Sequence, residues 1–134
     1  MAFTVADAQR VVDESGFGPW WGFVVESVGE GVARVRLPIR PELLRPGGVL
    51  QGAASMCTAD VALWLAIAAV EGRPATCVTL EEKTTYLRGA RSDITSEARL
   101  LKSGRRFIYG EASTYDAAGE LVAHHVLTYV RVDG

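Results

Sequence analysis

The stretch RPGGVLQGAASMCTADVALWLAIAAV, residues 45–70, decides the fold of this chain. It opens with a Pro-Gly-Gly turn, and its Ala-rich continuation predicts a long helix from about residue 51 to residue 69. Asp60 is the one charged residue inside this helix, and helical spacing places it on one face with the apolar Met56, Trp64 and Ile67. An unpaired carboxylate in apolar surroundings costs on the order of several kcal/mol, so Asp60 is the first candidate for a functional residue.

Extended segments flank the long helix on both sides. A short helix at 5–15 precedes a predicted hairpin, whose strands at 20–28 and 32–39 alternate apolar and polar residues. Four further extended segments follow the long helix, at residues 75–87, 92–103, 105–116 and 120–132. Short Gly-containing connections make each of these four the expected antiparallel neighbour of the next. A curved antiparallel sheet wrapped around the helix would bury it, so we expect a single α+β domain over residues 1–134.

The composition argues against several classes of function. Basic and acidic residues number 14 and 16, for a net charge of −2, which argues against nucleic acid as a partner. Cys57 and Cys77 lie in apolar sequence, which favours buried reduced thiols over a disulfide or a metal site. The N-terminus lacks the pattern of a signal peptide, and the run at 46–70 carries Asp60 near its middle and no flanking basic cluster. We therefore expect a cytoplasmic protein with no metal and no membrane partner.

A motif at the start of the long helix resembles that of a known family. Within RPGGVLQGA, residues 45–53, Gly48 and Gly52 are followed by Asp60 seven positions after the last residue. This spacing resembles N-x-x-G-x-x-H-G-G with a later Asp or Glu, the pattern of hotdog-fold thioesterases of the phenylacetate-degradation type. The segments VTLEEKTTYLRGA, LLKSGRRF and DAAGELVAHHVLTYV also resemble that family. Three positions depart from its pattern, namely Arg45 for Asn, Gln51 for His and Ala53 for the second Gly.

The resemblance implies a hotdog fold and the hydrolysis of acyl-CoA thioesters. Asp60 would act as general base on water or as nucleophile, and the Gly52 N–H at the helix start would bind the oxyanion. Gln51 could donate a hydrogen bond to the thioester carbonyl, although it cannot titrate. Thr79 matches a Ser or Thr that positions the water, and the resemblance places it across a subunit interface from Asp60.

The resemblance also implies residues that bind substrate. The turn from Lys102 to Arg105 resembles the part of the family that meets the coenzyme A phosphates. Arg45 is left with several interpretations, because it could hold an acyl group, bind a substrate carboxylate, pair with Asp60 or remain in solvent. Met56 and Trp64 are core residues or line an acyl pocket. The substrate-binding candidates are Arg45, Gly48, Met56, Trp64, Arg88, Lys102, Gly104 and Arg105.

Two further expectations concern assembly and the rival functions. The resemblance implies a homodimer or a dimer-of-dimers tetramer with active sites between subunits, and coenzyme A is part of the substrate rather than a cofactor. The main alternative is a non-catalytic protein that binds acyl-CoA or an aromatic ligand on the same scaffold. A hydratase ranks last because it needs a His near the helix, and the adjacent His124 and His125 lie on a strand, where we assign them no role.

Overall fold

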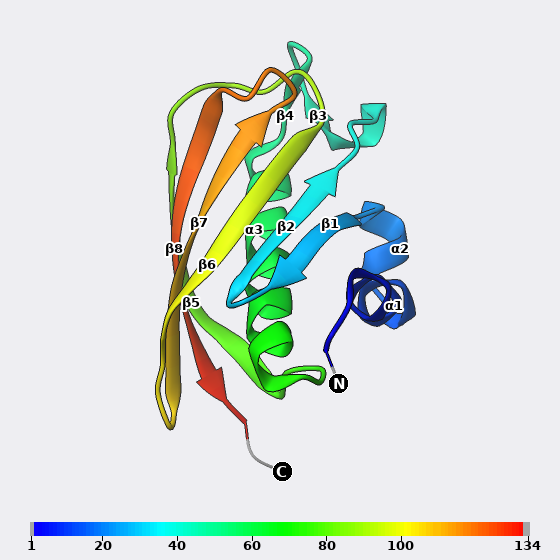
Figure 1. Ribbon diagram of the computed structural model, residues 1–134. Helices are drawn as coiled ribbons and strands as arrows, with labels where there is room; N and C mark the ends of the chain where they lie inside the picture. The colour runs from blue at the N-terminus through cyan, green and yellow to red at the C-terminus, as the bar shows by residue number, and fades with distance from the viewer. Residues whose placement is uncertain (1, 133–134) are drawn as a thin grey trace.

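The structure is a computed structural model that describes residues 2–132, and its centre is a long helix held by a curved antiparallel sheet (Figure 1). The helices are α1 (Val5–Glu14), α2 (Gly18–Trp21) and α3 (Gly52–Glu71), with a 3-10 turn at Pro41–Leu43. The strands are β1 (Val24–Gly29), β2 (Val32–Leu37), β3 (Leu44–Arg45), β4 (Val49–Leu50), β5 (Cys77–Tyr86), β6 (Ile94–Ser103), β7 (Phe107–Asp116) and β8 (Leu121–Arg131). This arrangement confirms the predicted α+β class and the wrapped helix.

The strand order of the large sheet is β1-β2-β6-β7-β8-β5. The β1–β2 hairpin and the antiparallel series β6, β7, β8 confirm the predicted neighbours. The expectation that β5 pairs with β6 is wrong, because β6 lies between β2 and β7, and β5 pairs with β8 at the far edge. Residues 87–93 connect β5 to β6, and seven residues reach roughly 23 Å, enough to cross three strand spacings of about 4.8 Å each.

The predicted strand at 20–28 begins later than expected. Residues 18–21 form the short helix α2, which has Pro19 near its start. Gly22 then adopts a left-handed conformation with φ of 80°, which ends that helix, and β1 begins at Val24. A proline early in a helix and a left-handed glycine after it are ordinary helix boundaries, and here they displace the strand.

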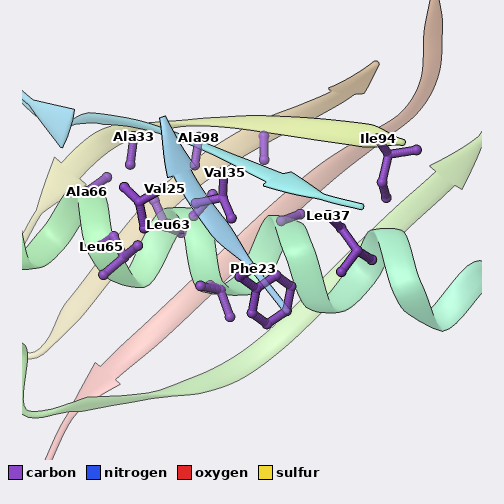
Figure 2. Packing of buried hydrophobic residues seen from close by; sticks show 14 of the residues in the cluster. Phe23, Val25, Ala33, Val35, Leu37, Leu63, Leu65, Ala66, Ile94 and Ala98 are labelled. Atoms are coloured by element: carbon purple, nitrogen blue, oxygen red, sulfur yellow. The ribbon is translucent and has the colours of Figure 1, made fainter. Parts of the chain in front are cut away.

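The core lies between α3 and the concave face of the sheet. α3 packs mainly against β2 and β6, and Figure 2 shows side chains such as Val35 and Ile94 directed from these strands toward the helix. α3 is long and apolar enough to cross a membrane by length and composition, with a mean hydropathy of 1.8. Yet 61% of that apolar window is buried inside the fold, as in the core helix of a globular domain.

α3 approaches the sheet closely at Gly110 of β7. A Cβ atom added there would lie 2.5 Å from Cδ1 of Leu63 and 2.9 Å from the carbonyl oxygen of Arg99. Leu63 is fully buried, so it has no free space into which to move. The small residue at position 110 therefore sets the distance between helix and sheet.

We expect Gly110→Ala to destabilise the fold by about 1–3 kcal/mol, because overpacking must displace Leu63 or the strand backbone. The measurement is the free energy of unfolding by urea. Gly16→Ala is the matched control, since a Cβ at Gly16 meets nothing within 4 Å. Equal stability of the two variants would contradict the close-packing role of Gly110.

Candidate active site

Asp60 lies on the side of α3 that the sheet leaves open. The incompletely buried residues of this side, in order along the helix, are Ala53, Met56, Cys57, Asp60 and Trp64. The sequence correctly placed Asp60 beside Met56 and Trp64, but Ile67, which we expected on the same face, is buried in the core. The carboxylate therefore sits at the boundary between the core and the open side of the helix.

Two hydroxyl groups hold one oxygen of the Asp60 carboxylate. Tyr129 Oη donates to Asp60 Oδ1 at 2.5 Å and lies 2.7 Å from the Asp60 carbonyl oxygen. Thr79 Oγ1 donates to the same Oδ1 at 2.7 Å. Among residues 2–132 no donor bonds Oδ2, so this second oxygen remains available for a water molecule. Two donors on one oxygen fix the orientation of the carboxylate, as a positioned base requires.

Tyr129 is a site residue that the sequence alone did not identify. It is 3% exposed, and burial followed by the charge of Asp60 raises the pKa of its hydroxyl well above the ordinary value. The hydroxyl therefore stays protonated at neutral pH and can only donate to Asp60. Tyr129 of β8 pairs directly with Thr79 of β5. The pairing of β5 with β8 would have identified Tyr129 as a site residue, but we did not predict this pairing from the sequence.

The structure also corrects the expected position of Thr79. We expected Thr79 to act across a subunit interface from Asp60, but the two side chains are bonded within one chain. The reason is the place of β5 at the edge next to β8, which brings its first residues beside the middle of α3.

A cavity of about 240 Å³ opens beside Asp60. Its lining residues are Phe17, Asp60, Val61, Trp64, Cys77, Val78, Thr79 and Tyr129. Phe17 and Trp64 form an aromatic pair with ring centroids 6.3 Å apart, and Phe17 is a second residue that the sequence did not identify. The cavity is thus apolar except where Asp60 and its two hydroxyl partners face it.

The cysteines near this cavity are poor nucleophiles. Burial, and after it the charge of Asp60, raises the pKa of Cys57 to about 12. Burial and the charge of Glu71 raise the pKa of Cys77 to about 11. Because the thiolate is the reactive form, both thiols are unreactive at neutral pH, which leaves Asp60 as the reactive group of the cavity.

The start of α3 carries the predicted oxyanion donor. Gln51 is the N-cap residue, and its side-chain oxygen accepts a hydrogen bond from the Ala53 N–H at 3.1 Å. Tyr86 Oη donates to the Gly52 carbonyl oxygen at 2.8 Å. Within the described chain the Gly52 N–H bonds no acceptor, as expected for the first residue of a helix. No acceptor among residues 2–132 bonds the Gln51 side-chain nitrogen, so this amide can donate as well.

A second and larger cavity, of about 390 Å³, lies at this helix start. Its lining residues are Arg45, Val49, Leu50, Gln51, Gly52, Ser55, Tyr86, Leu87, Arg88, Gly89, Ala90, Ile94 and Val122. Arg45 and Asp60 thus line different cavities and form no ion pair, so the interpretation that they pair within one chain is wrong. Gly48 lines neither cavity and instead forms the tight β3–β4 turn, with φ of 77°.

The remaining candidates line neither cavity. Lys102, near the end of β6, and Arg105, in the β6–β7 turn, are exposed at the end of the sheet opposite the β3–β4 hairpin (Figure 1). The Gly104 N–H closes this turn by donating to the Phe107 carbonyl oxygen at 2.8 Å. Met56 is half-buried on the open side of α3 and lines neither cavity. In residues 2–132 no group of three His, Cys, Asp or Glu side chains could hold a metal ion.

A buried polar network adjoins the site from the sheet. His125 is fully buried, with Nδ1 lying 3.3 Å from Glu82 Oε2 and 2.8 Å from Thr84 Oγ1. Its Nε2 lies 2.8 Å from Thr114 Oγ1, which bonds Ser96. Burial raises the pKa of Glu82, and the charge of Asp60 raises it further. The hydrogen bond to His125 acts in the opposite direction and lowers this pKa, but the net shift is upward. Glu82 is therefore a second carboxylate close enough to sense Asp60.

We expect Glu82→Gln to change how stability depends on pH. A carboxyl whose pKa is raised in the folded state contributes stability that is fully present below its unfolded pKa, near 4.5, and that is lost as pH rises through the folded value. The melting temperature of the wild type should therefore fall relative to Glu82→Gln as pH increases from about 4 to 7. Glu81→Gln, on the exposed neighbour, is the control. A constant difference between wild type and Glu82→Gln across this range would refute the expectation.

The curved sheet around a single long helix, with polar groups at the open side of that helix, defines the hotdog class of proteins. Comparisons with known proteins agree. The sequence model of the thioesterase superfamily matches residues 47–123, which include Gly52, Asp60 and Thr79. The chain belongs to the thioesterase superfamily.

Individual relatives support the same assignment. A conserved protein of Pseudomonas aeruginosa is 34% identical, with 92% of this chain and 98% of that chain covered and a TM-score of 0.84. A Halobacterium salinarum protein provisionally named an esterase is 29% identical over 82% of this chain and 76% of its own length. The PaaI protein from the phenylacetic acid degradation operon of E. coli has a TM-score of 0.85, covering 96% and 93% of the two chains, but at 18% identity this likeness concerns the fold alone. The chain is therefore a hydrolase of thioesters or esters.

Proposed function

We propose that the protein is an acyl-CoA thioesterase in which Asp60 activates water. The observation that carries this proposal is the Asp60 carboxylate itself. One oxygen is held by Tyr129 and Thr79, and the other is free beside an apolar cavity. Such a carboxylate is oriented for proton transfer and borders an apolar cavity that suits part of an acyl-CoA substrate.

The chemistry requires one base and one oxyanion donor. Asp60 Oδ2 takes a proton from water as the water oxygen attacks the thioester carbonyl carbon. The Gly52 N–H, with the Gln51 side-chain amide beside it, stabilises the negative charge that develops on the carbonyl oxygen. Collapse of the tetrahedral intermediate breaks the carbon–sulfur bond, and the thiolate takes the proton from Asp60. Direct attack by Asp60 on the carbonyl carbon is the other route open to this carboxylate.

Two subunits are needed to assemble this site. Gly52 and Asp60 are eight positions apart on one helix, or about 12 Å at a rise of 1.5 Å per residue. Tyr86, which bonds Gly52, and Thr79, which bonds Asp60, lie toward opposite ends of β5. If β5 of two copies pairs antiparallel, the Gly52 cavity of one subunit meets the Asp60 cavity of the other.

The edge of the sheet supports such an assembly. Within the described chain β5 is an edge strand paired only with β8, and its Val78 and Leu80 are 49% and 57% exposed. Exposed apolar edge strands favour pairing with another strand, here that of a second copy. We propose a homodimer, or a tetramer made of two dimers, with the active sites between subunits. We further propose that Lys102 and Arg105 bind the phosphates of coenzyme A. The proposed place of action is the cytoplasm.

We expect Asp60→Asn to lower kcat for acyl-CoA hydrolysis by about a hundredfold to ten-thousandfold, because the amide cannot accept the proton of water. The measurement is release of free thiol from a panel of aryl and short to long acyl-CoAs. Circular dichroism and the melting temperature check that the variant is folded. Turnover near the wild-type value would refute the role of Asp60. Binding of acyl-CoA with no turnover by the wild type would favour the non-catalytic binding protein.

Subunit complementation tests the shared site. We expect Gly52→Pro to lose activity because it removes the N–H, although proline suits the first helical position. Gly52→Ala is the control, since it adds the same Cβ near Tyr86 and keeps the N–H. Co-expressed Asp60→Asn and Gly52→Pro chains should recover about a quarter of wild-type activity, because half of the dimers are mixed and each has one intact site. If both residues served a site within one chain, mixing would restore nothing.

A further inference from the structure

The cavity at the start of α3 has an apolar interior and a cationic rim. Leu50, Ala90, Ile94 and Val122, which line it, are all buried core residues, so the cavity reaches into the core. Its formally charged lining residues, within the described chain, are the two arginines Arg45 and Arg88, and no carboxylate lines it. An apolar body that ends in an anion would match this distribution of charge.

The side-chain oxygens of Tyr86, Ser55 and Gln51 in this cavity are already engaged. Tyr86 Oη and Ser55 Oγ both donate to the Gly52 carbonyl oxygen, at 2.8 and 3.2 Å. Burial raises the pKa of Tyr86, so its hydroxyl stays neutral and adds no charge. The Gln51 side-chain oxygen caps the Ala53 N–H. A pantetheine arm, whose amides need several partners, would find few here, whereas an alkyl or aryl segment needs none.

Arg45 is the cation that is free to bind. Within residues 2–132 it forms no ion pair, whereas Arg88 lies 3.6 Å from Glu120. Arg45 sits at the end of β3, and the turn after it is held from outside by Arg91, whose Nη1 donates to the Gly47 carbonyl oxygen at 2.7 Å. The backbone that carries Arg45 is thus fixed, while its guanidinium group remains exposed at the cavity rim.

We propose that Arg45 selects thioesters whose acyl group ends in a carboxylate. The acyl chain lies along the apolar wall of the cavity, and its terminal carboxylate forms a forked pair with the Arg45 guanidinium. This inference rests on the proposed thioesterase function, because it takes the Gly52 N–H as the place of the thioester carbonyl. It assigns the acyl group to the cavity of the subunit that supplies Gly52.

The test compares matched thioesters that differ only in the terminal group, such as adipoyl-CoA and hexanoyl-CoA. Wild type should show the higher kcat/KM with the carboxylate-ended substrate. Arg45→Gln should lower kcat/KM for adipoyl-CoA by about tenfold to a hundredfold, the range of a charge-assisted hydrogen bond, and leave hexanoyl-CoA within about twofold. Arg45→Lys, which keeps the charge and loses the fork, should retain part of the preference. Arg99→Gln is the charge-matched control, on an exposed residue that lines neither cavity.

Three results would overturn the proposal. The first is a wild-type preference for hexanoyl-CoA. The second is an equal loss for both substrates in Arg45→Gln, since Arg45 would then bind the shared coenzyme A portion. The third concerns Asp60→Asn, in which binding of both thioesters is measured by calorimetry without turnover. Equal affinities of Asp60→Asn for adipoyl-CoA and hexanoyl-CoA would exclude carboxylate recognition. If adipoyl-CoA binds more tightly but wild type hydrolyses neither thioester, carboxylate recognition by Arg45 is upheld and only the thioesterase function is rejected.

Discussion

The structure depends on one constraint, the burial of a long apolar helix by a sheet too narrow to enclose it. The curved strands cover the side of α3 that carries Leu63, Leu65 and Ile67. They leave the side that carries Met56, Asp60 and Trp64 less covered. Asp60, Tyr129 and Thr79 lie on or beside this open side, and Gly52 lies at the start of the helix. Close packing at Gly110 brings Leu63 of α3 against β7.

The site is built by hydroxyl groups that orient a carboxylate. Asp60 has no cationic partner in the described chain, and its bonds come from Tyr129 and Thr79. A neutral hydroxyl can align a carboxylate without forming an ion pair with it, which suits the proposed base. Glu82, bonded to buried His125, is a second carboxylate, and the charge of Asp60 contributes to its raised pKa.

The two cavities lie toward opposite ends of β5, and each contains a different part of the proposed active site. The Asp60 cavity holds the proposed base, and the Gly52 cavity holds the proposed oxyanion donor together with Arg45. Gly52 and Asp60 are separated by about 12 Å along α3, so in the proposed mechanism each chain contributes one half of two shared sites. This division makes assembly a condition of the proposed chemistry.

The sequence by itself determined the long helix, the antiparallel strands around it, the position of Asp60 beside Met56 and Trp64, and the helix-start place of Gly52. Each follows from local periodicity or from the glycine turn before the helix, which neighbouring residues decide. Only the tertiary structure decided that β5 lies next to β8, that Tyr129 and Thr79 share one carboxylate oxygen, and that Arg45 and Asp60 face different cavities. These features join segments up to 69 positions apart, and such pairings depend on which strand edges remain free once the whole sheet has formed.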